Sequence, residues 1–183
     1  MDSFQERGSG LIFQRILWVD IPVNLARAYE GRGAFTLPSK LLKSKSVINV
    51  DSTSECFKYA VLAALHYHDI PTNRQRVSKY QEWVNQLDFG DLDVDSISVK
   101  DVPKIERLNN LKINVHLWDD ILRGPLYNAR HSTAPRTVNL LLVNTPLGQH
   151  YCAIVSLSAL YYHEQKAHHT KQFCERCCQS ARI

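Results

Sequence analysis

One segment, residues 51–65, constrains the fold of this chain more than any other. Its sequence, DSTSECFKYAVLAAL, begins with small polar residues and continues as a run that is apolar except for one lysine. Apolar side chains would cover most of the circumference of a helix formed by this run, as in helices that are buried on nearly all sides. Such a helix needs other layers around it, so we expect it at the centre of a layered domain.

A cysteine stands near the start of this predicted helix. Ser52 and Glu55 have the spacing of a capping box with Ser52 as N-cap, which places Cys56 in the first turn or just beyond it. A thiol becomes a nucleophile only as thiolate, and the positive end of a helix dipole lowers its pKa. Cys56 is therefore a candidate nucleophile, although a buried cysteine is also commonly an inert small hydrophobic residue.

The remaining sequence predicts helices first and strands afterwards. Apolar residues recur at helical spacing over residues 77–87 and 99–108, and from residue 112 the period changes to two, which predicts a half-buried strand over 112–118, with one face toward the core and the other toward solvent. Further strands are expected over residues 126–127, 137–143 and 150–155. Residues 11–19 fit a strand or a short helix. This order predicts an α+β domain in which the Cys helix and other helices pack on an antiparallel sheet.

The composition is that of a soluble globular domain. Of the 183 residues, 44% are hydrophobic and 22% are charged. Neither an apolar run of the ~20 residues that cross a bilayer nor a signal peptide is present, so we expect an intracellular protein of the cytoplasm or nucleus, with no membrane partner. The net charge of +4 is modest, and the basic residues are spread along the chain. A surface that binds nucleic acid would be expected to concentrate positive charge, so nucleic acid is not expected as a partner of this domain alone.

A histidine opens the last predicted strand, far downstream of the cysteine. The imidazole of His150 could accept the proton of the Cys56 thiol if the fold brings the two groups to ~3–4 Å. A cysteine at a helix start and a histidine at a strand start, close in space and distant in sequence, are typical of a papain-like site. Catalysis of this kind requires no cofactor.

A papain-like site usually contains a third side chain that holds the imidazole in the correct tautomer. Asn144 could lie across the expected hairpin from His150, and Ser156 follows on the chain a few residues later. Asp119 and Asp120 are further candidates. Each of these residues can also be explained as an ordinary turn or surface residue, so the sequence leaves the third member open.

The site also needs hydrogen-bond donors for the oxyanion. The main-chain N–H of Cys56 is available at the helix start, and the side chains that could contribute are Asp51, Ser54 and Asn49. Tyr151 directly follows His150 and could border the substrate channel where the strand begins, although core packing is its ordinary role. Cys152 is interpreted as a core or near-site thiol.

The C-terminal tail carries half of a metal site. Cys174 and Cys177 have the spacing of a zinc knuckle, and a complete tetrahedral shell would have to add Cys178, upstream histidines or ligands beyond Ile183. The five cysteines are an odd number, which does not indicate a disulfide framework. The sequence therefore leaves a structural zinc at the tail open, as an incomplete site.

Over nearly its whole length the chain resembles a domain found in proteins of Maverick/Polinton-like transposons and related viral elements, upstream of their protein-primed family B DNA polymerase. The matching segments are residues 8–10, 37–38, 47–50, 55–60, 63–66, 73–80, 102–106 with Asn109, 113–115, 138–142, 150–151 and 173–177. The resemblance depends on the combination of these motifs, because any one of them alone is unspecific.

The resemblance implies a papain-like cysteine peptidase related to the viral tegument-like deubiquitinases. Cys56 and His150 fall on the nucleophile and the base of that family, and Tyr151 holds the place of the aromatic residue that flanks the glycines of the ubiquitin tail. Where relatives often carry Asp or Asn six residues after the histidine, this chain has Ser156. We therefore expect an isopeptidase that cleaves after the C-terminal glycine of ubiquitin or a ubiquitin-like modifier, which would be its partner.

This interpretation divides the chain into an N-terminal extension packed on the core, residues 1–46, a papain-like catalytic core, residues 47–162, and a C-terminal tail, residues 163–183. Two alternative functions stay open. A cysteine protease that processes the polyprotein of a transposon or virus would use the same dyad. A noncatalytic domain associated with nucleic acid would depend on the net positive charge and on the half zinc site.

Overall fold

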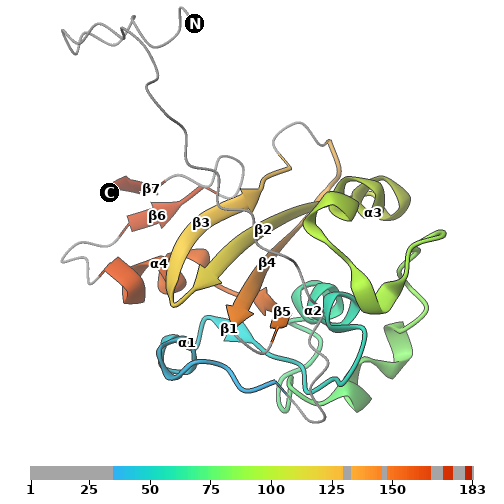
Figure 1. Cartoon of the computed structure of the whole chain (residues 1–183), viewed down its shortest axis with the longest axis horizontal. Coiled ribbons are helices and arrows are strands. Elements are labelled where there is room, and N and C mark those ends of the chain that lie inside the picture. Colours follow the sequence, from blue (N-terminus) through green and yellow to red (C-terminus); the bar gives the residue numbers. More distant parts are fainter. Residues whose placement is uncertain (1–34, 130–132, 146–147, 166–170, 175–179, 183) are drawn as a thin grey trace, which may run out of the picture.

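A five-stranded sheet is the main element of the computed structural model, which describes residues 35–129, 133–145, 148–165, 171–174 and 180–182 (Figure 1). The strands are β1 (Val47–Ile48), β2 (Leu111–Asp119), β3 (Ile121–Tyr127), β4 (Arg136–Thr145) and β5 (Gly148–Ile154), in the spatial order β1-β5-β4-β2-β3. A separate two-stranded sheet pairs β6 (Lys171–Phe173) with β7 (Ser180–Arg182).

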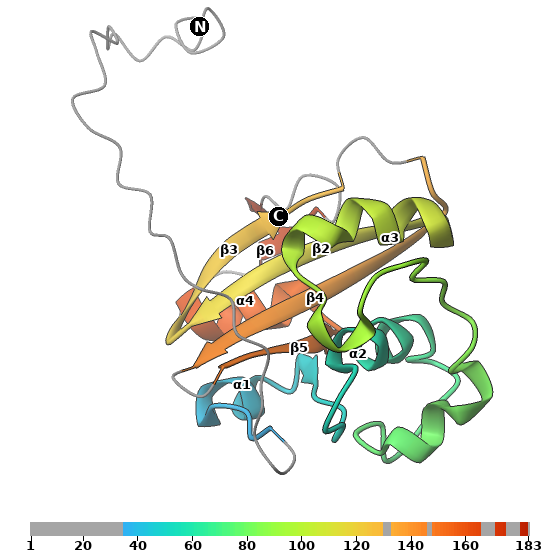
Figure 2. The same cartoon turned by 45° about the vertical axis from the view of Figure 1, so that its right-hand side comes forward.

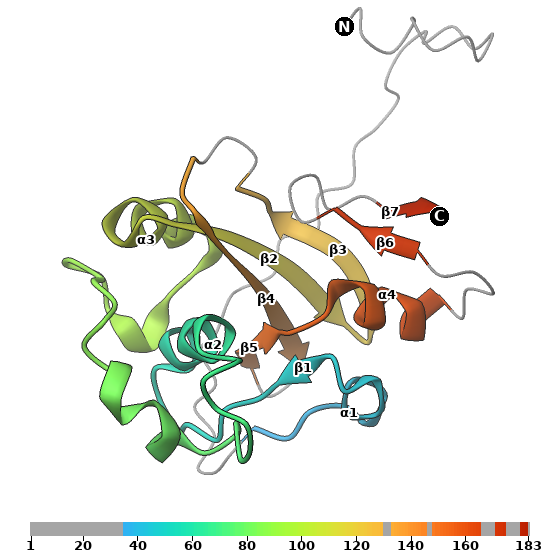
Figure 3. The same ribbon diagram turned by 180° about the vertical axis from the view of Figure 1, so that it is seen from behind.

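Helices cover both faces of the five-stranded sheet (Figures 2 and 3). On one face lie α2 (Cys56–Leu65) and α3 (Val102–Asn109), and on the other lies α4 (Leu157–Gln165). α1 (Ser39–Ser44) contacts α4 and β1, and the short 3₁₀ helices η2 (Val77–Trp83), η3 (Val94–Ser96) and η4 (Val99–Asp101) connect α2 to α3. The fold is therefore α+β, as predicted. In the described part of the chain, no helix combines the length and the apolar character needed to cross a membrane.

The sheet is mixed, not purely antiparallel. Pairing is antiparallel between β1 and β5, β5 and β4, and β2 and β3, but β2 and β4 are parallel, from Leu111 opposite Arg136 to Trp118 opposite Val143. The parallel pair arises because β3 runs back along the outer edge of β2 and the chain then returns on the other side of β2 as β4. The prediction of an antiparallel sheet therefore misses this one pair.

Helix α2 is the buried central helix that the sequence predicts, but its cap differs. It begins at Cys56, and its residues 57–63 are all buried. The N-cap is Glu55, in a left-handed conformation with φ 54°, so Ser52 lies three residues before the cap and the predicted capping box does not form. The carboxylate of Glu55 instead accepts a hydrogen bond from Lys58 Nζ at 2.5 Å, and its main-chain N–H donates to Asp95 at 3.0 Å.

Strand β2 is buried on both faces, which its alternating sequence does not indicate. Asn114 and His116 point away from α2, yet they are only 2% and 0% exposed. The imidazole Nδ1 of His116 lies 2.9 Å from the hydroxyl of Tyr161 in α4, and Asn114 Nδ2 donates to Asn139 Oδ1 at 2.9 Å. The cover is α4, which the sequence did not predict, and the expected start of the C-terminal tail at residue 163 falls inside this helix.

The described part of the N-terminal extension belongs to the core of the molecule. Phe35, Leu37 and Leu41 are buried in the same cluster as Trp118 and residues of α4. This cluster fills the space between α4 and the sheet, and a second cluster lies between the sheet and the pair α2 and α3. Residues 1–34, which include the segment expected as a strand or short helix at 11–19, lie outside the described residues.

Candidate active site

The thiol of Cys56 lies where the start of α2 meets the edge of β5. The main-chain N–H groups of Tyr151 in β5, of Phe57 and of Cys56 itself act on the sulfur as hydrogen-bond donors. The sulfur can reach β5 because β1 ends at Ile48, opposite Ala153, and leaves the edge of β5 without a paired strand at Tyr151. The structure thus brings the candidate nucleophile to the main chain directly beside His150.

Burial dominates the electrostatics of the Cys56 thiol. Loss of solvent raises the pKa of Cys56 above its usual value of 9.0, the three N–H groups lower it, and the Asp95 carboxylate raises it further. The net effect is a raised pKa, so the group is a neutral thiol at pH 7. The sequence predicted a lowered pKa from the helix start alone, and burial of the sulfur reverses that prediction.

The side chain of His150 leaves β5 on the face opposite α2. Its neighbour Tyr151 packs edge-to-face on Phe57 of α2, with ring centroids 5.0 Å apart, and successive side chains of a strand point to opposite faces. The imidazole of His150 stacks on Phe35 at 4.5 Å with an interplanar angle of 12°, and its Nε2 lies 2.8 Å from Asn49 Oδ1. The thiol therefore approaches β5 from the face on which α2 packs, whereas the imidazole leaves β5 on the opposite face.

The imidazole is enclosed in this arrangement. The side chain of His150 is only 2% exposed, and burial lowers its pKa to about 4. Burial also lowers the pKa of His116 on β2 to about 4. Both imidazoles are therefore neutral at pH 7, and His150 is chemically able to act as a base once it reaches a proton donor.

These two histidines predict acid-dependent stability. The unfolded chain takes up a proton at each histidine near the ordinary pKa of 6.5 and the folded chain only near 4, so between these values the unfolded state holds more protons. We expect the free energy of unfolding to fall as the pH is lowered from 6.5 to 4, by about 1.4 kcal/mol per pH unit for each histidine. Urea denaturation across this window measures the slope. His116→Gln should reduce the slope by that amount, and an unchanged slope would contradict the prediction.

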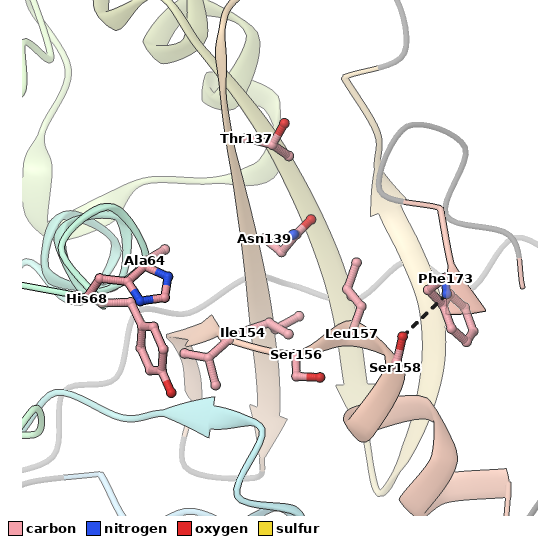
Figure 4. A pocket seen from close by; sticks show the side chains of 11 residues that line it. Ala64, His68, Thr137, Asn139, Ile154, Ser156, Leu157, Ser158 and Phe173 are labelled. Atoms are coloured by element: carbon pink, nitrogen blue, oxygen red, sulfur yellow. Dashed lines mark hydrogen bonds between the residues drawn. The ribbon is translucent and has the colours of Figure 1, made fainter. Parts of the chain in front are cut away.

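Ser156 does not lie beside His150. It stands six residues further along the chain, about 20 Å away at the rise of an extended strand. Its Oγ accepts a hydrogen bond from the N–H of Ala159 at 3.2 Å, as an N-cap residue of α4 would. Figure 4 shows Ser156 beyond the end of β5, in a cavity of about 320 Å³ that His68 and Asn139 also line.

The other predicted third members are also separated from the imidazole. Asn144 pairs with Gln149 across β4 and β5, while Val143 pairs with His150. Because directly paired residues share a face, Asn144 points to the face opposite the imidazole. Two strands away from β5, Asp119 ends β2 and Asp120 forms the turn into β3. The side chain that does hold His150 is Asn49, which the sequence suggested only as an oxyanion contributor.

The hydrogen-bond donors that act on the sulfur of Cys56 are main-chain N–H groups and not the predicted side chains of Asp51 and Ser54. Asp51 and Ser54 are exposed, and the N–H of Asp51 donates to the carbonyl of Gln75 at 2.7 Å. The donors that act on the sulfur include the predicted N–H of Cys56 and, in addition, the N–H of Tyr151. The ring of Tyr151 is 5% exposed and belongs to the core, so its main chain and not its ring faces the site.

The predicted zinc site falls only partly on described residues. Cys174 follows β6 and is exposed, whereas Cys177 and Cys178 lie outside the described residues. Among the residues that the structure describes, no group of three or more His, Cys, Asp or Glu side chains is placed to hold a metal ion. Zinc binding at Cys174 and Cys177 stays a prediction.

A cavity of about 570 Å³ lies against the candidate site, along the outer edge of β1. Its lining includes Phe35 and Asn49, which both contact the imidazole of His150, together with Asp51. The remaining wall is formed by residues 36–37, Leu42, 47–48 and 71–75. An extended chain bound in this cavity would touch the residues that enclose His150.

Comparisons of the chain with protein-family models, with curated proteins and with solved structures found no match. The structure therefore establishes an α+β fold with a five-stranded mixed sheet, and a narrower fold family is a matter of proposal. We base the function on the contacts of the site and on the family resemblance of the sequence.

Proposed function

We propose that this chain is a cysteine peptidase of papain-like architecture, with Cys56 as nucleophile and His150 as general base. The observation that carries the proposal is the packing of α2, which begins at Cys56, on β5, where the main-chain N–H of Tyr151, the residue next to His150, acts to lower the pKa of the thiol. A helix-borne thiol at the strand that bears an imidazole supplies the two groups that acyl transfer to sulfur requires. The resemblance of the sequence to papain-like peptidase domains supports the same roles.

The chemistry follows from these groups. The thiol passes its proton to the imidazole, and the sulfur forms a thioester with the carbonyl carbon of the substrate. The imidazolium returns the proton to the leaving amine, and water then attacks the thioester while the imidazole takes up its proton. The acid leaves and the thiol regains a proton. The N–H groups of Cys56 and Tyr151 lie at the sulfur and are available to stabilise the oxyanion.

One rearrangement must precede the first step. In the resting structure the thiol contacts the main chain of β5, while the imidazole is stacked on Phe35 on the other face. Proton transfer requires the nitrogen and the sulfur to come within hydrogen-bond reach, which apo structures often do not show. We infer that the imidazole turns toward the edge of β5 when a substrate occupies the cavity lined by Phe35 and Asn49.

Within this class we propose an isopeptidase that acts on ubiquitin or a ubiquitin-like modifier. The resemblance to the viral tegument-like deubiquitinases supports this choice of substrate. The end of such a tail is flexible and has no bulky side chains, so a narrow passage can select it by excluding larger residues. Cys56 would attack the carbonyl of the C-terminal glycine, and the leaving group would be the amine of a lysine.

A fluorogenic amide on the C-terminal glycine of ubiquitin tests the proposal. We expect the wild-type chain to hydrolyse it, and to hydrolyse a short peptide with the same two terminal glycines and the same dye at least about tenfold more slowly. Equal rates on both substrates would favour a polyprotein-processing protease. No hydrolysis of either, together with DNA binding that weakens steeply with added salt, would favour the noncatalytic alternative.

A further inference from the structure

We propose that the outer edge of β1 binds an extended segment of the acceptor protein, the chain that carries the leaving lysine, by adding this segment to the five-stranded sheet as a further strand. The identity of the ligand rests on the proposed function. The site itself is formed by main-chain groups of Val47 and Asn49, and peptide binding to it can be measured without hydrolysis. β1 lies at one end of the strand order, so only one of its sides is paired with another strand.

The register of β1 on β5 determines which main-chain groups face outward. Val47 lies opposite Ile154. The carbonyl of Ser46 accepts a hydrogen bond from the N–H of Val155 at 2.9 Å, so Ser46 is bonded to β5. In an antiparallel pair, residues bonded to the partner strand alternate with residues whose N–H and C=O point away from it. Ile48 is therefore also bonded to β5, and Val47 turns its N–H and C=O to the outer edge.

The extended conformation continues beyond Ile48. The side chain of Val47 packs on the cluster between α4 and the sheet, and Asn49 contacts Cys152 of that cluster. Ile48 and Val50 instead pack in the cluster that contains residues of α2. Side chains that alternate in this way are those of a strand, so Asn49 turns its main-chain N–H and C=O to the same side as Val47. None of the described residues bonds to these outward-facing groups.

The cavity of about 570 Å³ provides room for a ligand at this edge. Its lining includes residues 47–49 of the edge and residues 71–75. The two segments are connected where the N–H of Asp51 donates to the carbonyl of Gln75 at 2.7 Å. The volume is within the range of ligand pockets, ~300–1,000 Å³. An extended peptide in the cavity can form main-chain hydrogen bonds with Val47 and Asn49, as peptides do when they add to the edge of a sheet.

The opposite edge of the sheet, β3, is not suited to the same role. Pro125 in β3 has no N–H to donate, and the pairing of β2 with β3 contains two register shifts. Prolines and bulges of this kind protect a sheet edge against further pairing. Strand addition is therefore expected at β1.

The position of the cavity indicates which part of the substrate it binds. The imidazolium of His150 returns a proton to the leaving amine, so the segment that carries this amine must come within reach of the ring. Phe35 and Asn49 line the cavity and also contact the ring. A segment bound at the edge of β1 is thus on the side from which the amine departs.

The charges of the cavity favour a segment that contains lysine. The lining has two ionisable residues, Asp51 and Arg74. The guanidinium of Arg74 lies 4.2 Å from the ring centroid of Tyr67, and its Nε donates to the carbonyl of Tyr67 at 3.2 Å. The carboxylate of Asp51 is exposed. It would attract a cationic segment, because opposite charges raise the local concentration of a ligand.

Binding is measured with the N-acetylated, C-amidated peptide TVTKTVT and the ¹⁵N-labelled 183-residue chain. The β-branched residues of this peptide favour the extended conformation. We expect the amide signals of Val47 and Asn49 to shift when peptide is added, and their hydrogen exchange to slow about tenfold at saturation. The exchange of the Ile48 amide, which is already bonded to β5, should change less than about twofold. No change at Val47 at millimolar peptide would overturn the inference.

Kinetics test whether this edge binds the acceptor segment. The substrate is ubiquitin joined through its C-terminal glycine to the lysine of the same peptide, and the reference is the dye amide, which has no acceptor segment. Val47→Pro removes the outward N–H and is tolerated at a strand edge, and Val47→Thr, which retains the N–H, is the matched control. We expect the ratio of the two kcat/KM values, isopeptide over dye amide, to fall about tenfold in Val47→Pro and to stay within about twofold in Val47→Thr. A ratio that Val47→Pro leaves unchanged would contradict acceptor binding at β1.

N-methylated substrates give the same test on the wild-type protein, independently of whether a variant folds. Only alternate amides of an added strand face β1, so methylation of one alternate set of peptide nitrogens should lower kcat/KM about tenfold and methylation of the other set less than about twofold. Equal effects of the two sets would overturn the inference. If the wild type hydrolyses neither substrate but the peptide shifts the Val47 amide, the proposed function fails while strand addition at β1 stands.

Discussion

Replacing Cys56 with alanine should abolish hydrolysis of the ubiquitin amide, with kcat/KM reduced by about 10³-fold or more. The thioester cannot form without the sulfur, and the remaining groups of the site provide only binding and oxyanion stabilisation. Steady-state rates of dye release measure the effect. The thiol is partly buried at the first position of α2, and alanine favours helices, so the variant should stay folded.

Cys174→Ala is the matched control for this variant. Cys174 is an exposed cysteine that follows β6, far along the chain from the candidate site. We expect its removal to leave the rate within about twofold of the wild type, because its side chain is exposed and it lies outside α2 and β5, which carry Cys56 and His150. If Cys56→Ala retained the activity of the wild type, the assignment of the nucleophile would be wrong.

Phe57→Ala should produce the largest loss of stability among the substitutions considered, about 3–5 kcal/mol in the free energy of unfolding. The ring of Phe57 is 1% exposed and packs edge-to-face on Phe89 and Tyr151, with centroids 6.3 and 5.0 Å away. Its removal opens a cavity between α2 and the sheet, and it also deletes two aromatic pairs. Urea denaturation followed by circular dichroism measures the change.

An exposed apolar residue provides the comparison for this stability measurement. Leu42 in α1 is 57% exposed, so Leu42→Ala should change the free energy of unfolding by no more than about 0.5 kcal/mol. A loss below about 1 kcal/mol for Phe57→Ala would contradict the packing of α2 on β5. Because Phe57 fixes the face of Tyr151, that result would also remove the basis for placing His150 on the opposite face.

The parts of the fold that the sequence predicts are those with a clear period. The apolar run of residues 56–65 predicts α2, and the alternation over residues 112–118 predicts β2. Helix α4 has no such signal, because its sequence LSALYYHEQ shows no distinct apolar face. Missing α4 leads directly to the wrong expectation that one face of β2 is solvated.

For the candidate site, too, local sequence pattern predicts some features and not others. A helix start at Cys56 and a strand through His150 follow from local pattern, and the structure brings these two segments into contact. The face of β5 from which the side chain of His150 projects depends on the packing of Tyr151 against Phe57. A shift of the register of β5 by one residue would move this side chain to the other face. No local pattern contains that information. Asn49 was hard to identify for a similar reason, since its contact with His150 spans 101 residues of sequence.

An electrophilic ubiquitin probe, with a thiol-reactive group in place of the C-terminal glycine carbonyl, tests the central claim most directly. Incubated with the 183-residue chain and analysed by peptide mass mapping, the probe should form one covalent adduct, on the peptide that contains Cys56. His150→Gln should slow its formation, because the imidazole takes the thiol proton. An adduct on another cysteine, or a folded chain that forms none, would contradict the assignment of this protein as a cysteine peptidase of ubiquitin.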